Sequence, residues 1–401
     1  MSRAVLFQYF IAAAVTTAEG ALGQLFALYL DEYGYGAIVI GALASLLAVF
    51  RLVSRIPSGA AYRPERARRQ LIFWLGVFTL ATSGYALANG NAIAITLLTI
   101  AHGYAFGALG TYNLAVTIDL TGGERAGATM GWYTAALSTG YAIGAPAAGF
   151  VAERFGNPAA LAVFGLLPLL STVLVWPMPA ITAPSNAVAR APGLRSLLRA
   201  HAKADPRVWL AFLIVLYINV LSDSVDTFFP LYGLGIGISK ASSGLLKGLK
   251  SGAATFIRFV SGILFRYLDH RTVNFWSVLL FGFATIALSY VTTYWVLLAL
   301  FLVAGVARGL LRVTSAATVA ALRREGHDVG VASGIYNMGL DVGAIIGPMV
   351  GGFVGSLIGL GAMFQLVGLA SLLAYFAVAL ATPQGRAALT IGRPRPARAG
   401  S

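Results

Sequence analysis

The chain alternates long apolar segments with short polar ones over almost its whole length. A helix needs about 20 mainly apolar residues to cross the hydrocarbon core of a bilayer, which is about 30 Å thick. Twelve segments reach that length, so the pattern predicts twelve membrane-spanning helices. The predicted spans cover residues 4–30, 36–62, 71–88, 92–118, 128–151, 159–179, 207–232, 240–265, 272–291, 295–322, 329–354 and 361–382.

One long polar stretch, rich in Pro, Ala and Arg, separates the first six spans from the last six. We therefore expect four regions. They are a six-helix bundle over 1–180, a cytoplasmic linker over 181–206, a second six-helix bundle over 207–383 and a basic cytoplasmic tail over 384–401. The first span is too long for a signal peptide and contains Glu19, so we expect it to remain as a membrane span.

Composition agrees with a membrane protein. Of the 401 residues, 58% are hydrophobic and 10% are charged, whereas soluble domains have about 45–50% apolar and about 25% charged residues. So few charges exclude a chain of several soluble domains. The absence of cysteine excludes disulfides and thiolate metal sites.

The net charge of +14 has a simple explanation in a membrane chain. If both termini lie on one side, most Lys and Arg fall in loops on that side, and Arg154 and Lys240 fall on the other. The positive-inside rule then predicts a multi-pass protein of the cytoplasmic (inner) membrane with both termini cytoplasmic. The cations would contact anionic lipid headgroups of the bilayer, so we expect no nucleic-acid partner.

The two sets of six spans are related by an internal repeat. At an offset of 203 residues, the segment 55–63 matches 258–266 at both terminal arginines and at a Ser-Gly pair. Shared Gly, Tyr and Phe positions also relate 131–156 to 334–359, and 26–29 to 229–232. Two parallel six-helix halves follow, which is a repeat arrangement known for secondary transporters.

These features together resemble the major facilitator superfamily: six plus six spans, a basic loop after span 2, a long central loop, and glycine-rich spans 5 and 11. The loop after span 2 differs from the motif of that family, because Arg63 stands after Gly59 at the position where the motif has an acidic residue. The antiporter motif of span 5 appears in 140–149 with its proline displaced by one residue, and undistorted in 343–352. The resemblance implies an all-α membrane protein of twelve transmembrane helices in two pseudo-symmetric bundles.

Charged residues inside predicted spans are candidate functional groups, because they are costly at bilayer depth. On spans 7 and 8, Asp223, Asp226, Lys247 and Lys250 lie about 24–28 Å from the cytoplasmic ends. Their spacing predicts a ladder of two ion pairs, Asp223–Lys250 and Asp226–Lys247. The ladder either closes the outer end of the helical hairpin or acts as a gate or substrate site.

A second pair is predicted between Arg51 and Asp341, which lie at similar depths of about 18 Å. The resemblance implies that spans 2 and 11 pack together, so this pair would hold the two halves in one state. Proton binding by Asp341 is the alternative.

Glu19 has no lysine partner on span 2, because Ala44 and Leu47 occupy the positions that match Lys247 and Lys250. A buried carboxylate without a cation can exchange protons near neutral pH. His102 on span 4 lies at the same depth, about 25 Å from the cytoplasmic end. Glu19 and His102 are therefore the leading candidate proton site, and a passive hydrogen bond or no contact is the alternative. Asp223, Asp226 and Asp341 are further proton-coupling candidates.

Span 10 carries two arginines, Arg308 and Arg312, on one face. If they face a central cavity they would attract an anionic substrate; otherwise they neutralise buried acids. The other predicted substrate-binding residues are Tyr104, Asn113, Tyr217 and Tyr336.

Ion pairs are also predicted near the cytoplasmic ends. Arg63 would pair with Asp119 or Glu124, and Arg266 with Glu325 or Asp328, forming networks that break as an inner gate opens. Binding of lipid headgroups by these arginines is the alternative.

The sequence contains no zinc-protease, serine-hydrolase or Walker A motif, so no enzymatic activity and no cofactor are expected. We predict a monomeric secondary transporter that moves a small molecule with protons by rocking of its two halves. Proton-coupled export by antiport is favoured by the glycine-rich spans 5 and 11. Uptake or exchange of an organic anion is the alternative, favoured by Arg308 and Arg312. A membrane scaffold or an intramembrane enzyme using Glu19 and His102 is the alternative of another class.

Overall fold

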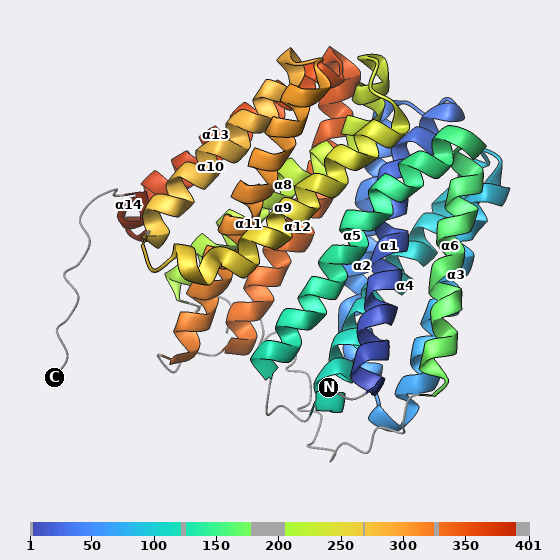
Figure 1. The fold of residues 1–401 in the computed structure, drawn as a ribbon. Helices are drawn as coiled ribbons and strands as arrows, with labels where there is room; N and C mark the ends of the chain where they lie inside the picture. The colour runs from blue at the N-terminus through green and yellow to red at the C-terminus, as the bar shows by residue number, and fades with distance from the viewer. Residues whose placement is uncertain (1–2, 122–125, 178–204, 268, 325–328, 390–401) are drawn as a thin grey trace.

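A computed structural model describes residues 3–121, 126–177, 205–267, 269–324 and 329–389. Within these ranges the chain is helical, and each of the twelve predicted spans corresponds to one long helix (Figure 1). The helices are α1 (Arg3–Glu32), α2 (Ala37–Ala61), α3 (Ala67–Ala88), α4 (Ala92–Thr121), α5 (Ala126–Phe155), α6 (Asn157–Val175), α8 (Pro206–Gly235), α9 (Lys240–Leu264), α10 (His270–Ala287), α11 (Tyr294–Arg324), α12 (Val329–Ile358) and α13 (Leu360–Ala381). Three short elements complete the list: the 3-10 helices η1 (Pro64–Arg66) and η2 (Leu288–Tyr290), and α14 (Pro383–Leu389).

Eleven of the long helices are long and apolar enough to cross a membrane. The exception is α9, which carries Lys247, Lys250 and Arg258 within its length. Cations so far inside a helix are tolerated in a bilayer only if they face protein or water. The predicted linker and tail fall largely outside the described residues, apart from the short helix α14.

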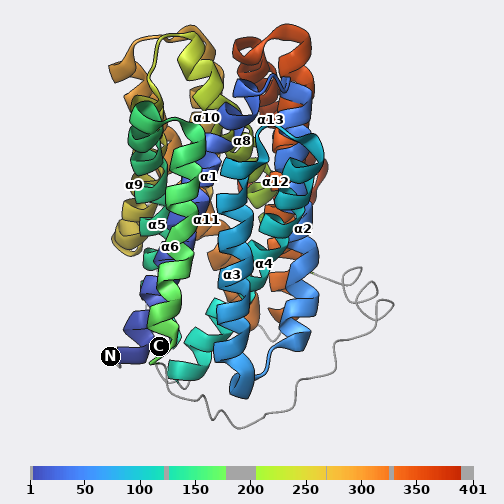
Figure 2. The ribbon, with the colours of Figure 1, turned by 90° about the vertical axis from the view of Figure 1, so that its right-hand side faces the viewer.

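The helices form two halves that lie side by side, α1–α6 in one and α8–α14 in the other (Figure 1). The halves meet where α2 packs on α12, α5 on α9, and α1 on α8. In the first half, α3 and α6 lie on the outer side, away from the second half (Figure 2). In the second half, α10 and α13 hold the corresponding outer position.

The internal repeat is visible in the contacts between the halves. A Cβ atom on Gly41 of α2 would lie 2.2 Å from the carbonyl oxygen of Pro348 on α12. A Cβ atom on Gly244 of α9 would lie 2.4 Å from the carbonyl oxygen of Ala145 on α5. Both residues of the first contact are 203 positions from their counterparts in the second. Small residues allow helices to approach this closely within a membrane.

The turns that follow α5 and α12 repeat as well. Gly156 and Gly359, which are also 203 positions apart, both adopt a φ of +84°. Residues with a Cβ rarely adopt this left-handed backbone, so glycine is required in both turns. The sequence repeat therefore corresponds to a repeated structure.

The two ends of the molecule differ. At one end, which we call the closed end, the halves are joined by hydrogen bonds. Gln24 Nε2 donates to Ser243 Oγ at 2.7 Å, and the Ala241 N–H donates to a Glu153 carboxylate oxygen at 2.9 Å. At the other end, where the N-terminus lies, the halves diverge (Figure 1). We call this the open end.

Candidate functional site

A cavity of about 840 Å³ lies between the two halves. Its walls come from α1, α2, α4, α5, α8, α9, α11 and α12. The lining begins near Gly23 and Lys247, close to the closed end, and extends along α4 and α5 to Ile118 and Tyr133 near the open end. A volume of this size can hold a small organic molecule.

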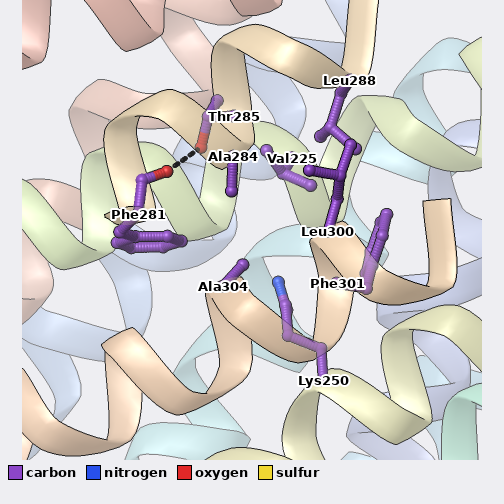
Figure 3. A pocket seen from close by; sticks show the side chains of 9 residues that line it. All are labelled: Val225, Lys250, Phe281, Ala284, Thr285, Leu288, Leu300, Phe301 and Ala304. Carbon is purple, nitrogen blue, oxygen red and sulfur yellow. Dashed lines mark hydrogen bonds between the residues drawn. The ribbon is translucent and has the colours of Figure 1, made fainter. Parts of the chain in front are cut away.

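A second void lies behind Lys250 and is much smaller, about 10 Å³. Figure 3 shows Lys250 reaching from α9 toward Phe301 and Ala304 of α11, with Phe281 and Leu288 of α10 and η2 beyond. Its other walls are almost entirely apolar. The void holds about one water molecule at most, so it is not a candidate substrate site.

Ten charged residues line the large cavity. Six are cations and four are carboxylates: Arg51, Arg55, Lys247, Arg258, Arg308 and Arg312, with Glu19, Asp223, Asp226 and Asp341. Charges at this depth in a membrane protein are functional candidates. Their pairing decides which of them are available to a ligand.

Glu19 and His102 are in contact, as the sequence suggested. His102 Nε2 lies 2.7 Å from Glu19 Oε2, and its Nδ1 lies 2.9 Å from the hydroxyl of Thr82 on α3. His102 is fully buried, whereas the Glu19 side chain is 12% exposed and lines the cavity. A proton can therefore reach the pair through Glu19. The proton-coupling role itself stays a prediction.

The predicted ladder between spans 7 and 8 is wrong in its pairing. Lys250 Nζ binds Asp226 Oδ1 at 2.6 Å, and Lys247 donates to backbone carbonyls instead of a carboxylate. Asp223 lines the cavity and makes no ion pair with the described residues. Residue counts from the cytoplasmic ends ignore helix tilt, and a tilt between two helices displaces their residues by about one turn relative to each other.

Asp341 on α12 binds two arginines of α2. Arg55 lies 3.0 Å and Arg51 3.7 Å from Asp341 Oδ1. The predicted Arg51–Asp341 contact is thus present, but Arg55 makes the shorter one. The i, i+4 spacing of Arg51 and Arg55 puts both on one helix face, which is the signal in the sequence for the second contact.

Three further arginines face the cavity from the second half: Arg258 on α9, and Arg308 and Arg312 on α11. Arg312 donates to Asn219 Oδ1 at 2.9 Å, and Arg258 to Ser138 Oγ at 3.4 Å. None of the three forms an ion pair with the residues that the structure describes. The buried Nε atom of each lacks a hydrogen-bond partner among those residues.

Arg258 was not among the predicted site residues. It is the repeat counterpart of Arg55, so the 203-residue offset was a signal that could have found it. Both arginines point into the cavity from equivalent helices, α2 and α9.

Of the remaining predicted substrate-binding residues, Asn113 lines the cavity and accepts a hydrogen bond of 2.8 Å from Gln8 Nε2.

The three predicted tyrosines are not among the cavity-lining residues. Tyr217 is buried in its own half, and its hydroxyl donates to the Val278 carbonyl. Tyr104 packs on Trp74, and Tyr336 packs among hydrophobic residues. Tyr133 and Tyr141 line the cavity. Helices that are apolar on all sides do not reveal which face is turned inward.

The predicted network near the open end differs from the observed contacts. Arg63 is exposed and donates to the carbonyls of Ala60 and Tyr62. Asp119 accepts a hydrogen bond of 2.6 Å from the Tyr62 hydroxyl rather than pairing with Arg63. Burial and the bond to Asp119 raise the pKa of the Tyr62 hydroxyl. The extended turn after α2 directs Arg63 outward.

The other partners predicted for this region, Glu124, Glu325 and Asp328, lie outside the described residues. The predicted roles of these acids and of Arg266 therefore stay predictions. Arg68, at the same end, stacks over the ring of Trp176 with its guanidinium carbon 4.4 Å from the ring centroid.

Comparison with known proteins gives a family model and several similar structures. The model described as Major Facilitator Superfamily matches residues 5–290 and 266–399. A crystal structure of the nucleoside transporter NupG is 13% identical, covers 98% of this chain and 100% of its own, and superposes with a TM-score of 0.79. A bacterial homologue of the human lysosomal transporter Spinster, in an inward-facing and unoccupied conformation, is 17% identical and covers 96% of this chain and 90% of its own, with a TM-score of 0.70.

One curated relative also matches in sequence. Monocarboxylate transporter 13 of Rattus norvegicus is 25% identical over 154 residues. The match covers 38% of this chain and 36% of the relative, so it spans little more than a third of either protein. Both structural likenesses are under 25% identity and show the fold.

Proposed function

The chain belongs to the major facilitator superfamily, and from that premise we propose that it is a proton-coupled transporter of a small organic anion. That it is a membrane transporter and not an enzyme follows from the family. The observation that carries the finer proposal is the set of cavity-lining arginines Arg258, Arg308 and Arg312, which have no carboxylate partner among the described residues.

The charge of the cavity supports an anionic substrate. Six cations face four carboxylates, and Asp341 engages Arg51 and Arg55. Asp226 forms an ion pair with Lys250, whose side chain lines the small void next to the cavity. Glu19 and Asp223 remain against the four cations of α9 and α11, so the net charge of this remainder is positive. An unpaired charge is costly in a membrane interior, and an anionic ligand would neutralise it. The planar guanidinium group suits a carboxylate, which it can bind through two parallel hydrogen bonds.

The curated relative supports the same substrate class, because it is named a monocarboxylate transporter. The match is partial, so it adds to the argument from charge and does not replace it. The nucleoside transporter and the Spinster homologue support the fold and carry no weight for the substrate.

The position of the Glu19–His102 pair at the cavity supports proton coupling. With a neutral imidazole and an ionised carboxylate the pair carries one negative charge on the cavity wall. Binding of one proton removes that charge and makes the cavity more positive. A proton and an anion would then each strengthen the binding of the other, and such linkage favours symport of the two.

The prediction of export depends on the glycines of spans 5 and 11. These glycines also have a packing role that does not depend on the direction of transport. A Cβ atom on Gly144 would lie 2.2 Å from the Thr17 carbonyl, and one on Gly347 2.7 Å from the Val220 carbonyl. The glycines thus permit close packing of α5 on α1 and of α12 on α8, whichever direction the substrate takes. With an inward proton gradient, symport would lead to uptake of the anion.

The orientation that we propose places the open end in the cytoplasm. Arg3, Arg63, Arg68, Arg207 and Arg271 all lie at helix ends on that side, and the positive-inside rule assigns them to the cytoplasm. Both termini would then be cytoplasmic. Both halves of one chain supply walls of the cavity, and we propose that the protein functions as a monomer.

The proposal is tested by transport in proteoliposomes. The purified protein would be offered radiolabelled pyruvate, succinate, uridine or tetraphenylphosphonium, with and without an acidic exterior. We expect an acidic exterior to drive accumulation of a carboxylate. Accumulation of the lipophilic cation alone would contradict the proposed substrate class. Carboxylate flux that does not depend on the pH gradient would contradict the proposed coupling.

A further inference from the structure

Lys247 is the cavity cation with the most unusual partners. Its side chain is buried, with 6% of the residue exposed. Its ammonium group donates to the Gly23 carbonyl of α1 at 2.6 Å and to the Asp226 carbonyl of α8 at 2.7 Å. The first acceptor belongs to one half of the molecule and the second to the other. Lys247 therefore ties the two halves together.

An ammonium group has three N–H donors. Two of them are used by the carbonyls, and Lys247 also lines the large cavity. A carboxylate is a stronger partner for a cation than a neutral carbonyl is, because the two opposite charges also attract each other. An anion in the cavity would thus compete with the Gly23 carbonyl for the ammonium group.

We call the bonds of Lys247 to the Gly23 and Asp226 carbonyls the tie. The tie lies next to the other contacts that close this end. In the first turns of α9, Ser243 and the Lys240 carbonyl both accept from Gln24 Nε2 of α1, at 2.7 and 3.2 Å. The Lys240 side chain donates to Asn157 Oδ1 of α6 at 3.1 Å. We call these contacts, with the Ala241–Glu153 bond, the latch. Lys247 lies one turn of α9 beyond Ser243, between the latch and the cavity.

We propose that Lys247 contacts the transported anion and also ties the two halves at the closed end, so that a bound anion releases the tie. In the empty protein Lys247 holds Gly23 and the closed end stays shut. When an anion binds, the ammonium group turns to it and the Gly23 carbonyl loses its partner. The latch is weakened and the closed end opens with substrate in place. The tie stands on the observed bonds alone, whereas its release by an anion rests on the proposed function.

The test measures the width of the closed end. Because the chain contains no cysteine, Asp31→Cys on α1 and Leu234→Cys on α8 would introduce two spin-label sites at exposed positions of the two halves. The distance between the labels would be measured by double electron–electron resonance on the full chain in nanodiscs, first without ligand. We expect Lys247→Met to raise the fraction of long distances about tenfold, as loss of a charged hydrogen bond predicts.

Two variants serve as controls. Gly23→Ala keeps the backbone carbonyl, and a Cβ atom there has no neighbour within 4 Å, so its distances should match those of the parent protein. Gln24→Ala weakens the latch without touching Lys247, so it should lengthen the distances and still respond to an anion. Distances in Lys247→Met that equal the parent's would overturn the tie, provided that the variant elutes as a folded monomer.

The second measurement adds pyruvate or succinate. In the parent protein either anion, if transported, should increase the long-distance fraction, and in Lys247→Met it should cause no further change. If an anion is transported by the parent protein but leaves its distances unchanged, release of the tie is overturned. If neither anion is transported while Lys247→Met opens the closed end, the tie stands and the proposed substrate class fails.

Discussion

Glu19 on α1 and His102 on α4 share a 2.7 Å hydrogen bond although 83 positions separate them in the sequence. One member is fully buried and the other reaches the cavity, so the pair connects the protein interior to the path of the substrate. This geometry leads to the first prediction.

Glu19→Gln should uncouple transport from protons. The amide can still hydrogen-bond His102, so the fold is preserved, but it takes up no proton at physiological pH. We expect exchange of labelled for unlabelled carboxylate across the liposome membrane to continue while accumulation driven by a pH gradient is lost. Full accumulation in this variant would exclude Glu19 as the coupling residue.

Arg308→Gln should weaken anion binding by at least about tenfold, because it removes an unpaired guanidinium group from the cavity wall. Thermal stabilisation by increasing concentrations of carboxylate would give the affinity. Arg68→Gln is the matched control, since Arg68 stacks on Trp176 outside the cavity. Equal affinity of Arg308→Gln and the parent protein would place the substrate elsewhere.

Asp341→Asn should destabilise the protein by about 2 kcal/mol, because it leaves Arg51 and Arg55 without their carboxylate. The cost is kept below that of a fully buried pair because the Arg55 side chain is 38% exposed and water screens its charge. A fall in the thermal unfolding temperature would be measured. Asp31→Asn, at an exposed position near the closed end, should leave that temperature unchanged.

Gly41→Ala should impair transport, because the added Cβ atom would lie 2.2 Å from the Pro348 carbonyl at the contact of α2 with α12. The halves cannot then approach as closely there. Gly76→Ala on α3 adds the same methyl group where no atom lies within 4 Å, and should transport normally. Initial rates in proteoliposomes would compare the two, and equal rates would show that the close contact is not needed.

Much of the fold could be predicted because its signals are local. A run of about 20 apolar residues reports a span wherever it occurs. The repeat also needed no structure, and Gly41 with Gly244 and Gly156 with Gly359 hold equivalent places in the two halves. The site was predicted in part. Depth along the helices placed Glu19 level with His102 and put Arg308 and Arg312 inside the membrane, and the structure added that the first two touch and that the arginines face the cavity.

The sequence by itself determined the twelve helices, their two-fold repetition and the set of charges that lie at bilayer depth. Only the tertiary structure decided how those charges pair. It joined Lys250 to Asp226, directed Lys247 to a carbonyl of the other half, and turned Tyr217 away from the cavity. The physical reason is that span length and depth depend on each helix alone. Pairing depends on the tilt and rotation of neighbouring helices, and a helix that is apolar all round does not encode its rotation.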